Sequence, residues 1–235
     1  MERRAERRLV TCLFVDIVGS TDLTLDLGPE RMKRLLDRAF GAIASSITER
    51  GGTVEKYVGD AIFALFGAPV AHADDPERAL RAADAFVSWT RAARAPVAVR
   101  VGIETGEAVV DLDGLAARQR MVLGACMNLA ARLQQRAAPG EILVGPGCYA
   151  ATTDTAVFEE LGLRPLKGFG EVEVRRLERM TDTPRPEPAF VGREPEMDAL
   201  RSAFARAAAG HATLVVVRGA PGLGKTRLAN EFTDR

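Results

Sequence analysis

The sequence has few cysteines and histidines, and it has no long apolar run. Its three cysteines, Cys12, Cys126 and Cys148, form no Cys-x-x-Cys pair, so neither a disulfide framework nor a zinc site is expected. The two histidines, His72 and His211, have no potential ligand at metal-binding spacing. No segment reaches the roughly 18 apolar residues that cross a membrane, and the start lacks a signal-peptide pattern. We therefore expect a cytoplasmic protein with no membrane partner.

Neither sign of charge is in excess. The 32 Lys and Arg residues balance 32 Asp and Glu residues, which gives a formal net charge of zero and a pI near 6.8. This balance lacks the basic surplus of nucleic-acid-binding proteins, so no nucleic-acid partner is expected. The Arg-rich residues 2–8 are interrupted by acids and are expected to form a solvated arm. The length of 235 residues suits one domain plus part of a second.

Hydrophobic periodicity predicts an α+β domain over residues 1–179. A nearly continuous apolar run at 9–15 is typical of a buried strand, and Gly28-Pro29 marks the start of a helix. Short strands at 53–58 and 61–66 are expected to form a hairpin. The other expected elements are a helix from Asp75 to about Arg94, a strand pair at 97–103 and 108–111, a helix over 125–136, a strand at 141–144, a helical turn near Cys148, and two strands flanking 167–170. The order β-α-β-β-α-β with appendages is a ferredoxin-like plan.

A second segment begins after a change in composition. Residues 180–189 contain three prolines and are predicted to form a stiff linker. Residues 190–235 then carry a predicted helix at 194–209, a strand at 213–218 and a Gly-rich turn into a last helix. This pattern predicts the beginning of an α/β domain.

Two aspartates are the first signs of a site. Asp16 follows a strongly apolar strand, where an unpaired carboxylate is costly to bury. Asp60 lies in the hairpin turn, so the two carboxylates meet if the hairpin lies beside the first strand. Such a pair could hold two divalent ions for phosphate chemistry, with the backbone of Gly19-Ser20-Thr21 offered to a phosphate. Alternatively, Asp16 caps a helix and Asp60 is only a turn residue.

Four segments in order resemble the motifs of class III adenylyl and guanylyl cyclases. They are LFVDIVGST at 13–21, EKYVGDA at 55–61, GACMNLAARL at 124–133 and LKGFG at 166–170. The resemblance covers about residues 9–177 and implies the class III nucleotide cyclase fold. The activity that it implies is the conversion of ATP to cyclic AMP and pyrophosphate.

The resemblance also implies a role for each matched residue. Asp16 and Asp60, assisted by the Ile17 carbonyl, would bind two Mg²⁺ or Mn²⁺ ions per site. The residues that would hold the nucleotide are Lys56 at the adenine ring, Asn128 at the ribose, Arg132 at the transferring phosphates, and Lys167 at the terminal phosphates. Independently of the resemblance, Asn128 and Arg132 stand four residues apart and share one helix face. Alternatively, each cation is solvated or paired with a surface acid.

In this family the site is shared between two catalytic modules. Because one sequence here carries both the aspartates and the nucleotide-holding residues, the resemblance implies a homodimer with two equivalent sites. Met121 stands where many members place a second base-reading Asp or Thr, and a thioether cannot hydrogen-bond the adenine amino group in the same way. A catalytically weak module that dimerises and controls a C-terminal ATPase is a second interpretation. A guanylyl cyclase is a third, which Lys56 disfavours because guanine-reading members usually carry an acid there.

The second segment carries a phosphate-binding motif. GAPGLGKT at 219–226 fits Gly-x-x-x-x-Gly-Lys-Thr between a predicted strand and a helix. Backbone amides around Gly219, Gly222 and Gly224 would hold phosphates, Lys225 would reach the β and γ oxygens, and Thr226 would hold Mg²⁺. The segment resembles the start of AAA/STAND-type ATPases. No second strand with a metal-coordinating acid follows it, so we expect a truncated P-loop α/β segment that cannot hydrolyse ATP efficiently.

Overall fold

The computed structural model describes residues 5–92, 97–111, 122–181, 190–219 and 224–233. Two units, Met1–Pro184 and Arg185–Arg235, are each considered by themselves. In the first unit the elements are β1 (Ala5–Val18), α1 (Ser20–Leu27), α2 (Pro29–Thr48), β2 (Thr53–Val58), β3 (Ala61–Phe66), α3 (Asp75–Ala92), β4 (Ala98–Asp111), β5 (Val122–Leu123), α4 (Ala125–Arg136), β6 (Ile142–Val144), α5 (Pro146–Thr152), β7 (Ala156–Leu166) and β8 (Gly170–Met180). In the second unit they are α6 (Glu194–Ala208) and α7 (Lys225–Thr233).

One sheet forms the centre of the first unit. Its strand order is β2-β3-β1-β4-β6-β8-β7, and β5 pairs with β4. The four strands β2-β3-β1-β4 are antiparallel and, with α2 and α3, form the ferredoxin-like βαββαβ core. A parallel step from β4 through α4 to β6 extends this core. The predicted α+β fold class is confirmed.

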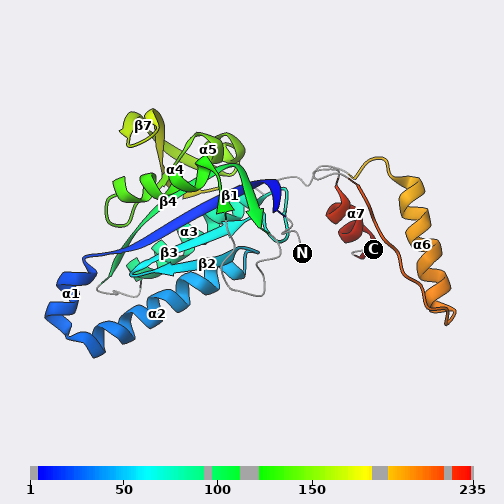
Figure 1. Cartoon of the computed structure of the whole chain (residues 1–235), viewed down its shortest axis with the longest axis horizontal. Helices are drawn as coiled ribbons and strands as arrows, with labels where there is room; N and C mark the ends of the chain where they lie inside the picture. The colour runs from blue at the N-terminus through cyan, green and yellow to red at the C-terminus, as the bar shows by residue number, and fades with distance from the viewer. Residues whose placement is uncertain (1–4, 93–96, 112–121, 182–189, 220–223, 234–235) are drawn as a thin grey trace. The chain divides into compact units, whose positions relative to one another are not determined.

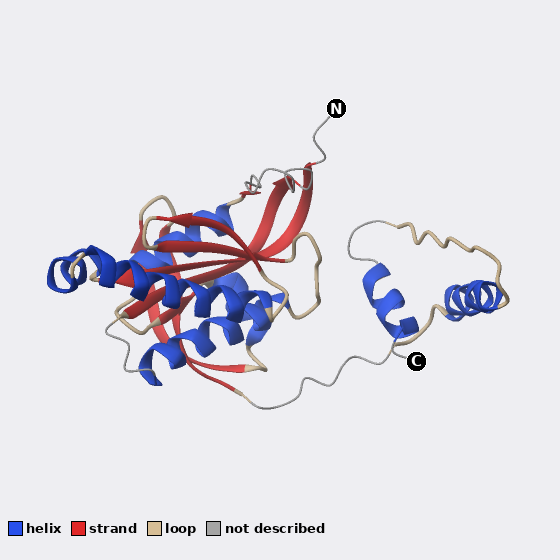
Figure 2. Cartoon of the chain, turned by 90° about the horizontal axis from the view of Figure 1, so that it is seen from below, coloured by secondary structure: helices blue, strands red, loops and turns tan. Residues whose placement is uncertain are grey.

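Helices cover both faces of the sheet (Figures 1 and 2). In Figure 1, α4 lies above β1 and α2 lies below it. Because side chains alternate along a strand, β1 contributes to two cores. Leu13 and Val15 pack in the cluster that α2 and α3 close, whereas Val10 and Cys12 pack in the cluster beneath α4.

The pairing of β1 with β4 differs from the sequence prediction in two ways. Residues 5–8, expected as part of a solvated arm, belong to β1 and pair with residues 108–111. The expected strand pair at 97–103 and 108–111 is instead one continuous strand, β4. Both errors have one cause, because the long antiparallel ladder satisfies backbone groups of residues that look like a loop in isolation. The helix α1 was also not predicted.

The second unit contains the predicted helix at 194–209, seen as α6, and the helix that follows the Gly-rich turn, seen as α7. The predicted strand at 213–218 is wrong, since these residues are not in a strand. A strand needs a hydrogen-bonding neighbour, and the described part of this unit supplies none. Over both units, no helix of the described ranges is long and apolar enough to cross a membrane.

Candidate active site

The β2–β3 hairpin lies beside β1 and places Asp60 next to Asp16. The strands β1 and β3 pair with Asp16 opposite Ala61, and the Ile17 amide donates to the Asp60 carbonyl at 3.2 Å. The turn closes through Gly59, whose φ of 62° is left-handed and suits glycine. The two aspartates therefore lie at the same end of neighbouring strands.

The Asp16 carboxylate is buried and has two side-chain partners. Its side chain is 12% exposed, and its Oδ2 accepts hydrogen bonds from Arg100 Nε at 2.7 Å and Gln134 Nε2 at 3.2 Å. Arg100 Nη2 lies 2.5 Å from the same oxygen. Arg100 stands directly opposite Asp16 in the ladder of β1 and β4, so the ion pair is a cross-strand pair. Asp16 does not cap α1, whose N-cap residue is Gly19.

Gln134 reaches Asp16 because α4 packs directly on the backbone of β4. A Cβ at Gly102 would lie 2.2 Å from the Gln134 nitrogen and 2.1 Å from the Ala130 carbonyl oxygen. Any larger residue there would push the helix outward. The absence of a side chain at Gly102 thus sets the depth of α4 against the aspartate.

Asp60 is connected to the start of α1. Ser20 Oγ donates to Asp60 Oδ2 at 2.5 Å, and Ser20 is the first residue of the helix. The open amides of a first helical turn favour anions. Gly19, Ser20 and the backbone of Thr21 thus form a possible phosphate site beside Asp60, while the Thr21 side chain lies outside the described part of the structure.

The residues expected at the ribose and the transferring phosphates lie on α4. Asn128 is exposed and Arg132 is partly exposed, one turn apart. Arg132 Nη1 donates to Gln135 Oε1 at 2.7 Å, so its partner is an amide and not a surface acid. The guanidinium can exchange this exposed neutral partner for a phosphate, which is a stronger, charged acceptor.

The two lysines lie at opposite margins of the sheet. Lys56 is exposed on the edge strand β2, and Lys167 is exposed in the turn between β7 and β8. In the described ranges, neither lysine, nor Asn128 or Arg132, has a hydrogen bond or ion pair to either aspartate. The structure therefore shows no direct contact between the aspartates and the residues expected to hold the nucleotide.

The sequence reasoning missed Arg100. A single arginine within an apolar strand carries no signal of its own, because long basic side chains often extend to solvent from a strand. The signal becomes visible only when the register of β1 and β4 is known, since this register sets Arg100 opposite Asp16. Met121, the expected base-contacting residue, lies outside the described residues.

The phosphate-binding motif of the second unit is described only in part. Residues 220–223, including Gly222, lie outside the described structure, as does the Thr226 side chain. Lys225 Nζ donates to the Gly219 carbonyl at 2.9 Å, and Gly224 has φ 73°. The preceding residues 214–217 are apolar and between 40% and 88% exposed.

We expect the Lys225→Ala variant to hydrolyse ATP no more slowly than the unmodified chain. The described part of this unit offers the motif no neighbouring strand and little buried apolar surface to hold it in place. Inorganic phosphate release from ATP should therefore be at background in both proteins. A phosphate release rate that falls on replacing Lys225 would contradict this expectation.

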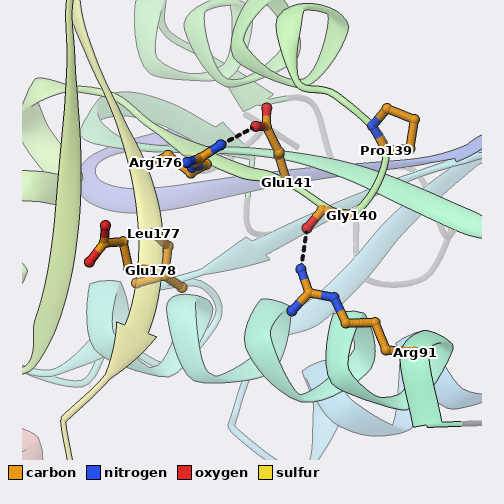
Figure 3. A pocket seen from close by; sticks show the side chains of 7 residues that line it. All are labelled: Arg91, Pro139, Gly140, Glu141, Arg176, Leu177 and Glu178. Carbon is orange, nitrogen blue, oxygen red and sulfur yellow. Dashed lines mark hydrogen bonds and ion pairs between the residues drawn. The ribbon is translucent and has the colours of Figure 1, made fainter.

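A hollow with a volume of its own lies elsewhere in the first unit (Figure 3). It measures about 540 Å³, and none of the predicted site residues lines it. Arg91 Nη2 donates to the Gly140 carbonyl at 2.9 Å, and Arg176 Nη1 to Glu141 Oε1 at 2.6 Å, as the dashed lines show. Because none of the residues predicted for the site lines this hollow, it is not the candidate site.

A further buried carboxylate, Glu104, lies on β4 near the start of α5. It is 5% exposed, its Oε1 accepts from the Gly147 amide at 2.9 Å, and its Oε2 has no hydrogen-bond partner. Burial raises the pKa of Glu104 to about 7, and the Gly147 amide limits the rise by stabilising the charged form. Glu104 is thus a proton-binding group that the predicted site does not use.

We expect the free energy of unfolding of the first unit to decrease as pH rises, because of Glu104. The folded-state pKa lies above the ordinary value of 4.5, so the folded protein binds more protons between these values. The stabilisation is complete below about pH 4.5 and is lost as pH rises through about 7, which costs about 3 kcal/mol. Glu104→Gln should remove this dependence, while Glu107→Gln, at an exposed ion pair with Arg7, should not.

The measurement is urea unfolding at several pH values. The only tryptophan, Trp89, packs against the core of the first unit, so its fluorescence follows this unit alone. Parallel stability curves for the Glu104→Gln variant and the unmodified protein between pH 5 and 8 would show that Glu104 does not titrate there.

The fold is that of a class III nucleotide cyclase domain. The sequence profile of the adenylate and guanylate cyclase catalytic domain matches residues 3–179, and the chain belongs to this family. A profile of the AAA ATPase domain matches residues 189–235. The predicted family, and the order of its two segments, are therefore confirmed.

Individual proteins also resemble this chain in sequence. Adenylate cyclase 1 of Rhizobium meliloti is 32% identical over 71% of this chain and 27% of its own length. An uncharacterized protein of the same organism is 31% identical over 99% of this chain and 24% of its own length. The chain thus spans about a quarter of the length of these relatives.

Solved structures agree with this fold. The adenylyl cyclase CyaB from P. aeruginosa has a TM-score of 0.70 and 27% identity, over 79% of this chain and all of that one. The guanylyl cyclase Cya2 has a TM-score of 0.65 and 29% identity, over 78% of this chain and 97% of that one. One of these structures is an adenylyl cyclase and the other a guanylyl cyclase, so the structural similarity does not decide between ATP and GTP as the substrate.

Proposed function

We propose that this chain is an adenylyl cyclase that converts ATP to 3′,5′-cyclic AMP and pyrophosphate at a site shared by two copies. The observation that carries the proposal is the placement of Asp16 on β1 and of Asp60 in the adjoining β2–β3 turn, beside the first turn of α1. Two adjacent carboxylates next to an anion-favouring helix start suit a metal-bound polyphosphate. The family membership supports the same class of reaction.

The residues at this end of the sheet fit Mg²⁺ or Mn²⁺. Carboxylate and carbonyl oxygens are the ligands that these hard cations prefer, and Asp16, Asp60 and the Ile17 carbonyl offer that set. Within the described residues, no cluster of three or more His, Cys, Asp or Glu side chains could hold an ion, so the remaining ligands would come from phosphates and water. When bound, two such ions would activate the ribose 3′-hydroxyl and neutralise phosphate charge.

The chain's own side chains would divide the remaining work. Asn128 would orient the ribose, so that its 3′-oxygen faces the α-phosphorus in line with the bond to the β-phosphate. That bond breaks as the new ester forms, and pyrophosphate leaves. Arg132 would stabilise the charge that develops on the phosphates, and Lys167 would hold their outer end. Arg100, 2.5 Å from Asp16, would fix the carboxylate before substrate binds.

A second copy of the chain would complete each site. Within the described part of one chain, Lys56, Asn128, Arg132 and Lys167 have no hydrogen bond or ion pair to either aspartate, which leaves them available to a site on a partner chain. Exposed apolar side chains also support it: Leu9, Val109 and Leu123 are 65%, 38% and 58% exposed and share one face of β1, β4 and β5 by register, around the exposed ion pair of Arg7 and Glu107. Such a surface favours contact with another protein surface.

The choice of ATP is tested by comparing kcat/KM for ATP and GTP. Lys56 supports adenine, but we expect only a modest preference because Met121 replaces a polar base reader. A site that hydrogen-bonds one base rejects the other by leaving buried groups unpaired. Met121→Asp should therefore sharpen the preference about tenfold. A chain that already prefers ATP several hundredfold would contradict the role given to Met121, and a chain that prefers GTP would contradict the choice of ATP.

A further inference from the structure

Two buried cysteines from distant parts of the chain meet beneath α4. The Sγ atoms of Cys12 in β1 and Cys126 in the first turn of α4 lie 3.9 Å apart. Both are free thiols, as is Cys148. A disulfide requires about 2.05 Å between sulfurs, so the two atoms need to approach by about 1.9 Å. Closing this gap requires rotation of the two side chains and movement of the helical turn that carries Cys126.

The fold brings α4 close to the sheet at this point. Gly106 of β4 lies under the first turn, and a Cβ there would be 3.0 Å from the Cys126 Cβ. The missing side chain leaves Cys126 seated against the sheet, next to Cys12. Cys126 Sγ also lies 3.7 Å from the Glu107 carbonyl oxygen, which holds the thiol in this position.

The two thiols differ in pKa and in exposure, as the attacking and resolving thiols of a reactive pair do. The hydrogen bond with Cys12 lowers the pKa of the Cys126 thiol; burial opposes this effect, and the Met127 amide adds to it. The same hydrogen bond raises the pKa of Cys12 well above its ordinary value, and burial adds to the rise. Cys126 is also the more accessible of the two, at 5% exposed against 0%. Cys126 is therefore the thiol that an oxidant meets first, and Cys12 is the partner that resolves it.

We propose that Cys12 and Cys126 form a peroxide-responsive thiol pair, whose disulfide displaces the first turn of α4 and slows the enzyme. The effect on turnover rests on the proposed function, because α4 carries Asn128 and Arg132. Formation of the disulfide itself does not.

The reaction balances with hydrogen peroxide as the oxidant. The Cys126 thiolate attacks one peroxide oxygen, the O–O bond breaks, and the product is a sulfenic acid while the other oxygen leaves as water after taking a proton. The Cys12 sulfur then attacks the Cys126 sulfur, the S–O bond breaks, and the hydroxyl leaves as water with the Cys12 proton. Two thiols lose two electrons, and one peroxide gains them.

The disulfide can be read directly by peptide mass. The whole chain is treated with hydrogen peroxide, its remaining thiols are alkylated, and it is digested with trypsin without a reductant. Cleavage after Lys and Arg puts Cys12 in residues 9–31, Cys126 in residues 121–132 and Cys148 in a third peptide. We expect residues 9–31 and 121–132 to be joined, and cyclic nucleotide formation to fall about tenfold or more and to return with a dithiol.

Matched variants separate this pair from general oxidation. Cys126→Ala and Cys12→Ala should each abolish the joined peptide and the peroxide sensitivity, with Trp89 fluorescence checking that each is folded. Cys148→Ala should behave like the unmodified chain, because that thiol is fully buried and its pKa is raised by burial. The proposal fails if both thiols stay open to alkylation after denaturation of the peroxide-treated chain, or if Cys126→Ala loses activity as fast as the unmodified chain. A joined peptide in a chain that makes no cyclic nucleotide would refute the proposed function and not the thiol pair.

Discussion

Replacing Asp60 by Asn should reduce cyclic nucleotide formation by about 10³-fold or more. Loss of one negative ligand removes a catalytic ion or displaces it, which costs several kcal/mol of transition-state stabilisation. The amide oxygen of Asn can still accept the Ser20 hydrogen bond seen at 2.5 Å, so the fold should be preserved. Asp16→Asn should have an effect of the same order, although it also weakens the buried ion pair with Arg100. The rate of cyclic AMP formation from Mn²⁺-ATP is the measurement.

Asp37→Asn is the matched control. Asp37 is an exposed acid on α2 whose partner is Lys33 at 2.7 Å, and its loss should leave the rate within a factor of about two. Light scattering and Trp89 fluorescence would establish that each variant stays folded and keeps the oligomeric state of the unmodified chain. If the Asp16 and Asp60 variants both keep more than about a tenth of the activity, these carboxylates do not hold the catalytic ions.

Mixing two inactive variants should restore activity. In a dimer of one Asp60→Asn chain and one Arg132→Ala chain, one of the two sites carries both changes and the other carries neither. After equal amounts are mixed and re-equilibrated, about half of the dimers are mixed, so about a quarter of the activity should return. The measurement is cyclic AMP formation, with two different affinity tags to count mixed dimers.

The control mixture is Asp60→Asn with Asp16→Asn. Both changes fall on the same set of residues, so neither site of the mixed dimer is intact and no activity should return. Activity in this control, or mixed dimers of Asp60→Asn and Arg132→Ala that stay inactive, would contradict a shared site.

The position of the aspartates follows from local patterns in the sequence. An apolar run that ends at Asp16, and a turn at Gly59-Asp60 between two short strands, are enough to predict a strand beside a hairpin. The pairing of β1 with β3 then brings their ends together. The sequence also predicts α2, α3 and α4, because glycine and proline indicate where helices begin and end, and apolar residues at helical spacing indicate the buried face.

Arg100, Gln134 and Glu104 could not be assigned in the same way. Each acquires its partner through contacts between elements distant in sequence. Arg100 and Gln134 do so through the packing of β4 and α4 at Asp16, and Glu104 through the first turn of α5 at Gly147. Residues 5–8 entered the sheet for the same reason, since their pairing with β4 is long-range. Local propensity carries no information on such contacts.

The most direct test of the account is the product made from ATP by the purified chain. The chain is incubated with Mn²⁺ and ATP, and cyclic AMP and pyrophosphate are measured together. We expect the two products in equal amounts, at a rate that rises more than linearly with chain concentration while the homodimer is forming. No cyclic AMP above the level of a chain carrying both Asp16→Asn and Asp60→Asn, at concentrations where the chain is dimeric, would contradict the account.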